Sequence, residues 1–282
     1  MKWQDLRRSR NVVDRRNARR TAATGGGLGL GGMILVLAFA LLTGQNPLAL
    51  LGLVQQTTPS TSQTQPQVRQ DENSDFVQAI LGDTEVVWGE IFAASGQTYQ
   101  EPELVLFSEG IESACGFAGS AAGPFYCPGD SRVYMDLSFF GQLEATAGEE
   151  AEFARAYVIA HEVAHHVQNR LGILAEVQAQ RRGLSTSESN ALQVRVELQA
   201  DCLAGVWGHY TAQRGIIEQA DINRALQAAA AVGDDHLQRQ SRGRVVPESF
   251  THGTSEQRMR WFSRGLASGD SADCGTFNTS AL

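Results

Sequence analysis

Apolar residues recur at helical spacing over most of the C-terminal two thirds of the chain. Between residues 75 and 94 they fall on one side of a predicted helix, at Phe76, Ile80, Val87, Ile91 and Phe92. The same period predicts further helices after residue 148, at residues 149–172, 185–215, 221–233 and 254–265. The C-terminal part of the chain is therefore expected to be helical almost throughout.

Capping residues set the boundaries of these predicted helices. The helix at 149–172 begins with acidic residues, which favour a helix N-terminus, and stops at Gly172. Ser and Thr residues open the helix at 185–215. Asp221 is the predicted N-cap of the next helix. Thr254 is the predicted N-cap of the last one, with Glu256 or Gln257 in its first turn.

Two segments before these helices have the composition of β-strands, at residues 103–107 and 132–140. A glycine-rich stretch bounded by two cysteines separates them. Strands followed by helices along the chain predict an α+β fold, mostly helical with a small sheet.

The N-terminal third has a different pattern, because no charged residue occurs from Thr21 to Val68. Residues 25–54 are largely apolar, and about 20 such residues span the roughly 30 Å hydrocarbon core of a bilayer. We expect one N-terminal transmembrane helix at 25–54, a flexible linker at 55–75 and a folded domain at 76–282. A cleaved signal peptide is the competing interpretation, since Ala38–Phe39–Ala40 resembles a cleavage site.

Charge is distributed unevenly between the two ends. Residues 1–20 hold eight of the 23 Lys and Arg against two acids, which leaves 15 basic and 29 acidic residues in the remainder. An acidic body argues against a nucleic-acid partner. Basic residues before a transmembrane helix favour a cytoplasmic segment at 1–24 and an extracytoplasmic body, in a single-pass protein of the inner (plasma) membrane.

All four cysteines lie in the predicted outer domain, at Cys115, Cys127, Cys202 and Cys274. An even number of cysteines in an oxidising compartment indicates disulfides. The short loop between them favours pairing of Cys115 with Cys127, which leaves Cys202 with Cys274. Buried free thiols are the alternative, above all for Cys202, which lies in an apolar helix.

The helix at 149–172 carries the candidate chemistry, an H-E-x-x-H motif formed by His161, Glu162 and His165. Positions i and i+4 share one helix face, so both imidazoles can bind one metal ion, and zinc accepts such nitrogens. Glu162 is then placed as a general base for a metal-bound water without being a ligand. His166 points about 100° away from His165 and is expected to support or pack.

A catalytic zinc needs a third protein ligand and an open position. The predicted helix at 185–215 offers Glu197 and Asp201, again spaced i, i+4. With Glu197 as the ligand, Asp201 can accept the second ring N–H of a ligating histidine. The reverse assignment, with Asp201 as the ligand, stays open.

These segments resemble the bacterial neutral zinc metallopeptidases, a family of membrane-anchored proteins. The matching segments are HEVAHHVQ, ELQADCLAGVW, GPFYCPGD, VYMDLSFF and SFTHGTSEQR. H-E-x-x-H followed by E-x-x-x-D is also similar to the glutamate zincins, in which the glutamate is the third ligand and the aspartate supports a histidine. The resemblance implies a zincin-like domain, bound Zn²⁺ and peptide or protein substrates.

The same resemblance gives a role to the C-terminal segment. His252 and Arg258 are similar to a T-H-x-x-x-x-x-R pattern of relatives, in which the histidine stabilises the tetrahedral oxyanion. A surface histidine beside the last helix is the alternative for His252. Zincins also pair extended substrate with an edge strand, for which 132–140 is the candidate; an ordinary core strand is the alternative there.

Our hypothesis is a membrane-anchored zinc endopeptidase in which His161, His165 and Glu197 hold the metal. Glu162 serves as its general base, and His252 assists as a second catalytic residue. The rival hypothesis is a non-catalytic, membrane-tethered binding or assembly module with a structural zinc site. A different metal, bound without Glu197, is a third interpretation.

Overall fold

The computed structural model describes residues 1–16, 68–119, 123–147, 152–231 and 233–282. Almost all of them belong to one compact unit, formed by Met1–Val13 together with Val68–Leu282. A second unit, Asp14–Gln67, has only residues 14–16 among those described. The predicted anchor at 25–54 and most of the linker thus lie outside the described residues. No helix in the described part of the chain has the length and apolar character to cross a membrane.

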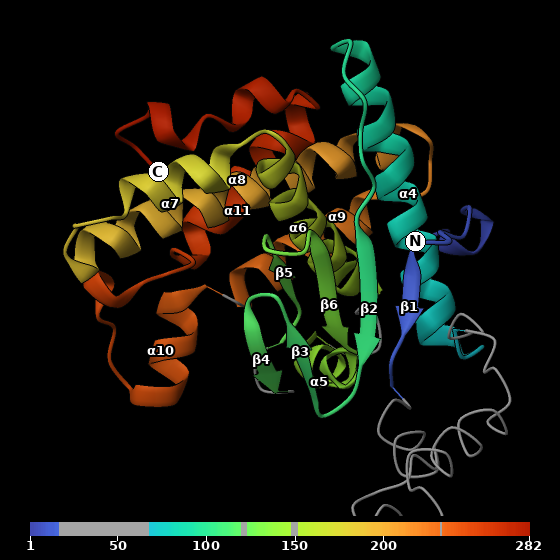
Figure 1. Ribbon diagram of the computed structural model, residues 1–282, viewed down its shortest axis with the longest axis horizontal. Coiled ribbons are helices and arrows are strands. Elements are labelled where there is room, and N and C mark those ends of the chain that lie inside the picture. The colour runs from blue at the N-terminus through green and yellow to red at the C-terminus, as the bar shows by residue number, and fades with distance from the viewer. Residues whose placement is uncertain (17–67, 120–122, 148–151, 232) are drawn as a thin grey trace, which may run out of the picture. The chain divides into compact units, whose positions relative to one another are not determined.

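The larger unit is mostly helical, with one small sheet, one hairpin and several 3-10 helices (Figure 1). Its strands are β1 Val12–Asp14, β2 Glu103–Phe107, β3 Gly110–Ser113, β4 Gly116–Gly119, β5 Phe125–Cys127 and β6 Arg132–Asp136. The helices are α4 Glu72–Ala94, α5 Ser138–Ala147, α6 Glu152–Arg170, α7 Ile173–Gln180, α8 Thr186–Gln213, α9 Gln219–Ala231, α10 Asp234–Arg242 and α11 Ser255–Ser268. The 3-10 helices are η1 Trp3–Asp5, η3 Pro247–Ser249, η4 Ser271–Cys274 and η5 Thr276–Asn278. This content confirms the α+β class; the zincin architecture stays a prediction.

The sheet has the strand order β1-β2-β6-β5. β2 and β6 are parallel, whereas β5 is antiparallel to β6. The predicted strand at 132–140 is wrong in its second half, because β6 ends at Asp136 and α5 begins at Ser138. The Asp136 carboxylate accepts the Ser138 N–H at 2.9 Å, which turns the chain out of the sheet and into the helix.

Most predicted helices are confirmed, together with two of their caps. Capping boxes begin α8, through Ser185 and Glu188, and α11, through Thr254 and Gln257. Asp221 is not the N-cap of α9, which begins at Gln219, because its carboxylate instead accepts the Glu218 N–H at 2.8 Å from within the first turn. The short helices α7 and α10 were not predicted.

The first residues of the chain form part of the compact unit. Trp3 and Val12 are core residues with 4% and 6% exposure. In Figure 1 this segment, drawn in blue, lies beside α4 and the β2 edge of the sheet. The sequence pattern treats residues 1–24 as a segment separate from the body, whereas residues 1–13 fold with it.

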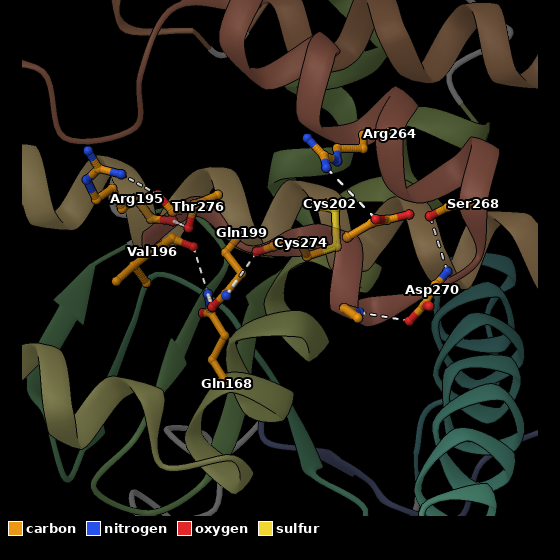
Figure 2. The surroundings of a disulfide bond; sticks show 12 residues. Gln168, Arg195, Val196, Gln199, Cys202, Arg264, Ser268, Asp270, Cys274 and Thr276 are labelled. Atoms are coloured by element: carbon orange, nitrogen blue, oxygen red, sulfur yellow. Dashed lines mark hydrogen bonds and ion pairs between the residues drawn. A yellow bond between two sulfur atoms is a disulfide. The ribbon is translucent and has the colours of Figure 1, made fainter. Parts of the chain in front are cut away.

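Both predicted disulfides are present, Cys115 with Cys127 and Cys202 with Cys274. The first joins the β3–β4 turn to the end of β5. The second joins α8 to η4 (Figure 2). No cysteine is left as a free thiol.

Helices α8 and α11 cross closely because each has a glycine at the crossing. A Cβ on Gly205 would overlap the carbonyl oxygen of Phe262, and a Cβ on Gly265 would overlap that of Cys202. The close crossing brings the C-terminal helix against the middle of α8, where the candidate site lies.

We expect Gly205→Ala to destabilise the protein by about 1–3 kcal/mol, because the added methyl forces two backbones apart. Gly208→Ala is the matched control in the same helix, since its Cβ would meet only the flexible end of the Leu266 side chain. Thermal unfolding of the two purified variants measures the difference. Equal melting temperatures would show that the crossing tolerates a side chain.

Candidate metal centre

Helices α6 and α8 pack side by side and place the predicted ligands opposite one another. His161 and His165 lie one turn apart on α6, and Glu197 lies on α8. One ligand atom from each of these residues falls within 4.8 Å of the others. Tertiary packing thus brings together the three residues that sequence reasoning had assigned to the metal.

The distances within this cluster fit a zinc site. The Glu197 Oε2 atom lies 3.2 Å from His161 Nε2 and 3.3 Å from His165 Nε2. Two ligands held about 2.0–2.1 Å from zinc in tetrahedral geometry lie roughly 3.3 Å apart. Two imidazoles and a carboxylate are also the ligand set of known catalytic zinc sites. The residues present therefore fit Zn²⁺.

The far side of each imidazole faces an acceptor. His161 Nδ1 lies 2.9 Å from Asp201 Oδ1, and His165 Nδ1 lies 2.8 Å from Gln168 Oε1. The Gln168 amide nitrogen donates to the Val196 carbonyl and to Gln199, which leaves its oxygen for His165. In a metal-bound state each Nδ1 would keep its proton and each Nε2 lone pair would be directed at the metal.

Asp201 supports His161 and is not one of the clustered ligand atoms. Its oxygens accept two bonds from Arg258, at 2.8 and 2.9 Å, and a further bond from the Tyr157 hydroxyl. Asp201 has no exposed surface, and Arg258 is 4% exposed. With these partners, Asp201 occupies the supporting position that the sequence predicted, and the reverse assignment has no geometric support.

The second oxygen of Glu197 is also held in place. The Gln193 side-chain amide nitrogen donates to Oε1 at 2.8 Å, and Arg181 in turn donates to the side-chain oxygen of Gln193 at 2.8 Å. Oε2 is thereby turned toward the two histidines. Gln193 lies one turn before Glu197 on the same helix, as Tyr157 does before His161.

Neighbouring charges shift the pKa values of the cluster. Burial opposes the charged form of His161, but the Asp201 carboxylate outweighs it and raises the pKa of His161 to about 9. Burial likewise opposes the charge of Glu197, and the two histidines hold its pKa well below the usual range. Glu197 is therefore ionised, and a metal ion would displace a proton from the imidazoles.

Glu162 lies beside the cluster and faces open space. Its side chain lines a cavity of about 860 Å³ together with His161, His165 and Glu197. Among the described residues, none forms a hydrogen bond with the Glu162 carboxylate. It is thus available to a water molecule or a substrate in the cavity.

The cavity also receives residues from distant parts of the chain. Tyr126 of β5, Phe139 of α5, Leu237 of α10 and His252 line it. The lining therefore combines apolar side chains with a few polar groups, which is the composition of a small-molecule or peptide site.

His252 lies at this cavity and is held by Asp234. The His252 Nδ1 is 3.4 Å from Asp234 Oδ1, and the side chain is 49% exposed. Asp234 also accepts the backbone N–H groups of residues 251–253. The bond with Asp234 raises the pKa of His252, which favours the imidazolium.

His166 points away from the cluster, as expected. Its Nε2 lies 2.7 Å from the Gln100 carbonyl oxygen, and its Nδ1 lies 3.1 Å from the Tyr126 hydroxyl. Burial lowers the pKa of His166, so the ring is neutral and Nε2 carries the proton. His166 therefore links α6 to β5 and to the loop that precedes β2.

Sequence reasoning missed the supporting residues, above all Tyr157, Gln168, Gln193 and Gln199. Helical spacing relative to the ligands could have found Tyr157 and Gln193, which stand at i−4 from His161 and Glu197. No local signal marks Gln199, which bonds Gln168 and the Cys274 carbonyl (Figure 2). Arg258 was noted for its motif, and its bond to Asp201 was not foreseen.

The fold and this site together define a candidate zinc metallopeptidase, and comparison with known proteins gives the family. Residues 1–277 match the family described as "Putative neutral zinc metallopeptidase", and the chain belongs to that family.

Several relatives cover much of the chain. The Escherichia coli (strain K12) protein YpfJ, described as uncharacterized, is 47% identical over 99% of this chain and 100% of its own length. The uncharacterized proteins Mb2605 of Mycobacterium bovis and Rv2575 of Mycobacterium tuberculosis (strain H37Rv) are each 44% identical over 65% of both chains. No solved structure matches the chain.

We expect the purified protein to bind one zinc ion and Glu197→Ala to weaken binding by more than about 100-fold. Loss of a supporting residue alone costs roughly 10–100-fold. Elemental analysis and competition with a chelating dye measure this. Glu176→Ala, which removes an exposed carboxylate on α7, is the control. Unchanged zinc affinity in Glu197→Ala would exclude this residue as a ligand.

Proposed function

We propose that the chain is a zinc-dependent endopeptidase whose centre is formed by His161, His165 and Glu197. One observation carries the proposal: the three-residue cluster and the unpaired Glu162 carboxylate face the same cavity. A structural zinc site is closed by four protein ligands, whereas a catalytic site keeps one position open.

Zinc held by this cluster would lower the pKa of a water molecule and polarise the scissile carbonyl. Glu162 would take a proton from the water that attacks the carbonyl carbon and would give it to the amine as the C–N bond breaks. His252, as an imidazolium at the same cavity, donates a hydrogen bond to the oxygen that becomes negative in the transition state. Asp201 keeps His161 oriented during these steps.

The sheet suggests how an extended peptide is held. β6 is paired on both sides, by β2 and β5, so it is unavailable to substrate and the candidate strand at 132–140 is wrong for this role. β5 is at the edge of the sheet, and Phe125 and Tyr126 of β5 line the cavity. In our proposal the peptide adds to β5 as a further strand.

The rival function, a tethered module with structural zinc, has less support. Helices α6 and α8 are already joined without a metal, through Gln168 and through the Asp201 network. The Cys202–Cys274 disulfide adds a covalent link behind α8. A domain tied in these ways is expected to keep its fold when the metal is removed.

Membrane attachment rests on the charge-free stretch at 25–54, which lies outside the described residues. It stays a prediction and supports a function close to a membrane surface.

We expect Glu162→Gln to retain zinc and to lose peptide cleavage by about 10²–10⁴-fold, the usual contribution of general acid–base catalysis. The amide keeps the shape of the side chain but cannot accept the proton. Cleavage of an unbiased fluorogenic peptide library, with zinc content measured in parallel, tests this.

Two outcomes would contradict the proposal. Normal turnover by Glu162→Gln would remove the general base from the mechanism. Unfolding of the native protein by a chelator, with no cleavage of any peptide before chelation, would favour structural zinc.

We expect Asp234→Asn to shift the alkaline limb of the kcat/KM profile to lower pH. Asp234 is the main cause of the raised pKa of His252; Glu197 also raises this pKa, whereas burial and Arg258 lower it. Activity that needs the imidazolium is present below the pKa of His252 and is lost as the pH rises through it. Removing the Asp234 charge lowers this pKa, so activity is lost at a lower pH.

Asp235→Asn is the matched control, because that neighbouring carboxylate binds Ser255 and not His252. Identical alkaline limbs in the two variants and the native protein would show that His252 does not act as an acid in the reaction.

A further inference from the structure

The N-terminal residues are joined to the body by backbone hydrogen bonds to three separate places. The Lys2 N–H donates to the Ile216 carbonyl at 2.8 Å, after α8. The Ser9 N–H donates to the Gln78 carbonyl at 2.9 Å in α4, and the Leu104 N–H of β2 donates to the Asn11 carbonyl at 2.8 Å. The segment is therefore an integral part of the fold.

The basic residues of this segment pair with acids of the body. Arg8 binds both oxygens of Asp75 at 2.7 Å, and Arg7 binds Glu85 at 2.6 Å. The Glu85 carboxylate, in a residue 3% exposed, also accepts from Ser9 and Asn11. Arg7 and Arg8, which in the sequence favour a cytoplasmic N-terminus, thus form ion pairs with carboxylates of α4.

The sequence of α4 is itself adapted to the segment. Gly82 lies in the middle of α4, and a Cβ there would overlap the Arg7 carbonyl oxygen. Trp3 packs edge-on against Phe76 of the same helix, with ring centroids 5.3 Å apart. The body has both the space and the side chains to receive residues 1–13.

These contacts constrain the topology of the chain. A single membrane crossing between residues 14 and 67 would separate the two flanks by the roughly 30 Å hydrocarbon core. Hydrogen bonds of 2.8–2.9 Å cannot form across that distance. The flanks of the apolar stretch must share one compartment whenever the protein has this fold.

We propose that residues 1–13 and 68–282 lie in one compartment, on the same side of any membrane to which the protein is attached. The two disulfides favour the oxidising side for both flanks. This replaces the arrangement with a cytoplasmic N-terminus that the charge pattern alone predicts.

Cysteine labelling in spheroplasts tests the proposal, because all four native cysteines are in disulfides and an added cysteine is then the free thiol. Arg10→Cys probes the N-terminal segment, and Arg182→Cys, at an exposed site after α7, probes the body. With a membrane-impermeant maleimide, both are expected to react to the same extent before permeabilisation. Labelling of Arg182→Cys in intact spheroplasts, with Arg10→Cys reactive only after permeabilisation, would overturn the proposal.

A second experiment tests the docking of the segment in the purified full-length protein. Gly82→Ala is expected to lower the melting temperature by several degrees, since about 1–3 kcal/mol of overpacking corresponds to roughly 2–4 °C per kcal/mol in a protein of this size. Gly89→Ala, in the same helix with nothing near its Cβ position, is expected to leave it unchanged or slightly raised. Equal melting temperatures for both variants would show that residues 1–13 are not seated on α4.

Discussion

The geometry of the site depends on one buried charge, the carboxylate of Asp201. It belongs to α8, yet its partners are Tyr157 and His161 of α6 and Arg258 of α11, so a single group fixes three helices relative to one another. An unpaired carboxylate at such a position would cost several kcal/mol, and the Arg258 guanidinium supplies the compensating charge. Burial favours the neutral acid, but Arg258 and His161 together lower the pKa of Asp201 to about 2.

The two sides of α6 therefore serve different purposes. On one side, His161 and His165 are held from behind by Asp201 and Gln168, and their Nε2 atoms face Glu197. On another, His166 bonds the Gln100 carbonyl and helps to seat the helix against β5. The two histidines are preorganised by Asp201 and Gln168, which do not line the cavity, and this reduces the reorganisation that metal or substrate binding would need.

Around this centre the chain uses devices that make the scaffold rigid. Glycines at the α8–α11 crossing allow the two backbones to approach. The Cys202–Cys274 disulfide joins α8 to η4, and a hydrogen bond from Gln168 to Gln199 joins α6 to α8 (Figure 2). The N-terminal segment packs on α4 through Trp3 and ends in β1, an edge strand of the sheet. Two arginines of that segment form ion pairs with α4, so they stabilise the fold. A membrane topology derived from the positions of charges alone ignores these ion pairs.

The sequence by itself determined the long helices and the H-E-x-x-H and E-x-x-x-D positions, because helical period, capping and i, i+4 spacing are local properties of the chain. It also favoured both disulfide pairings, through the short loop between Cys115 and Cys127. It also determined the family. Only the tertiary structure decided that Glu197 meets both histidines, that Arg258 pairs with Asp201 and that β5 lies at an edge of the sheet whereas β6 does not. It also decided that residues 1–13 belong to the body. Each of these features depends on contacts between residues that are distant in the chain, and such contacts leave no periodic pattern in the sequence. They are decided by side-chain packing and by the pairing of buried charges, which occur only when the helices and strands come together.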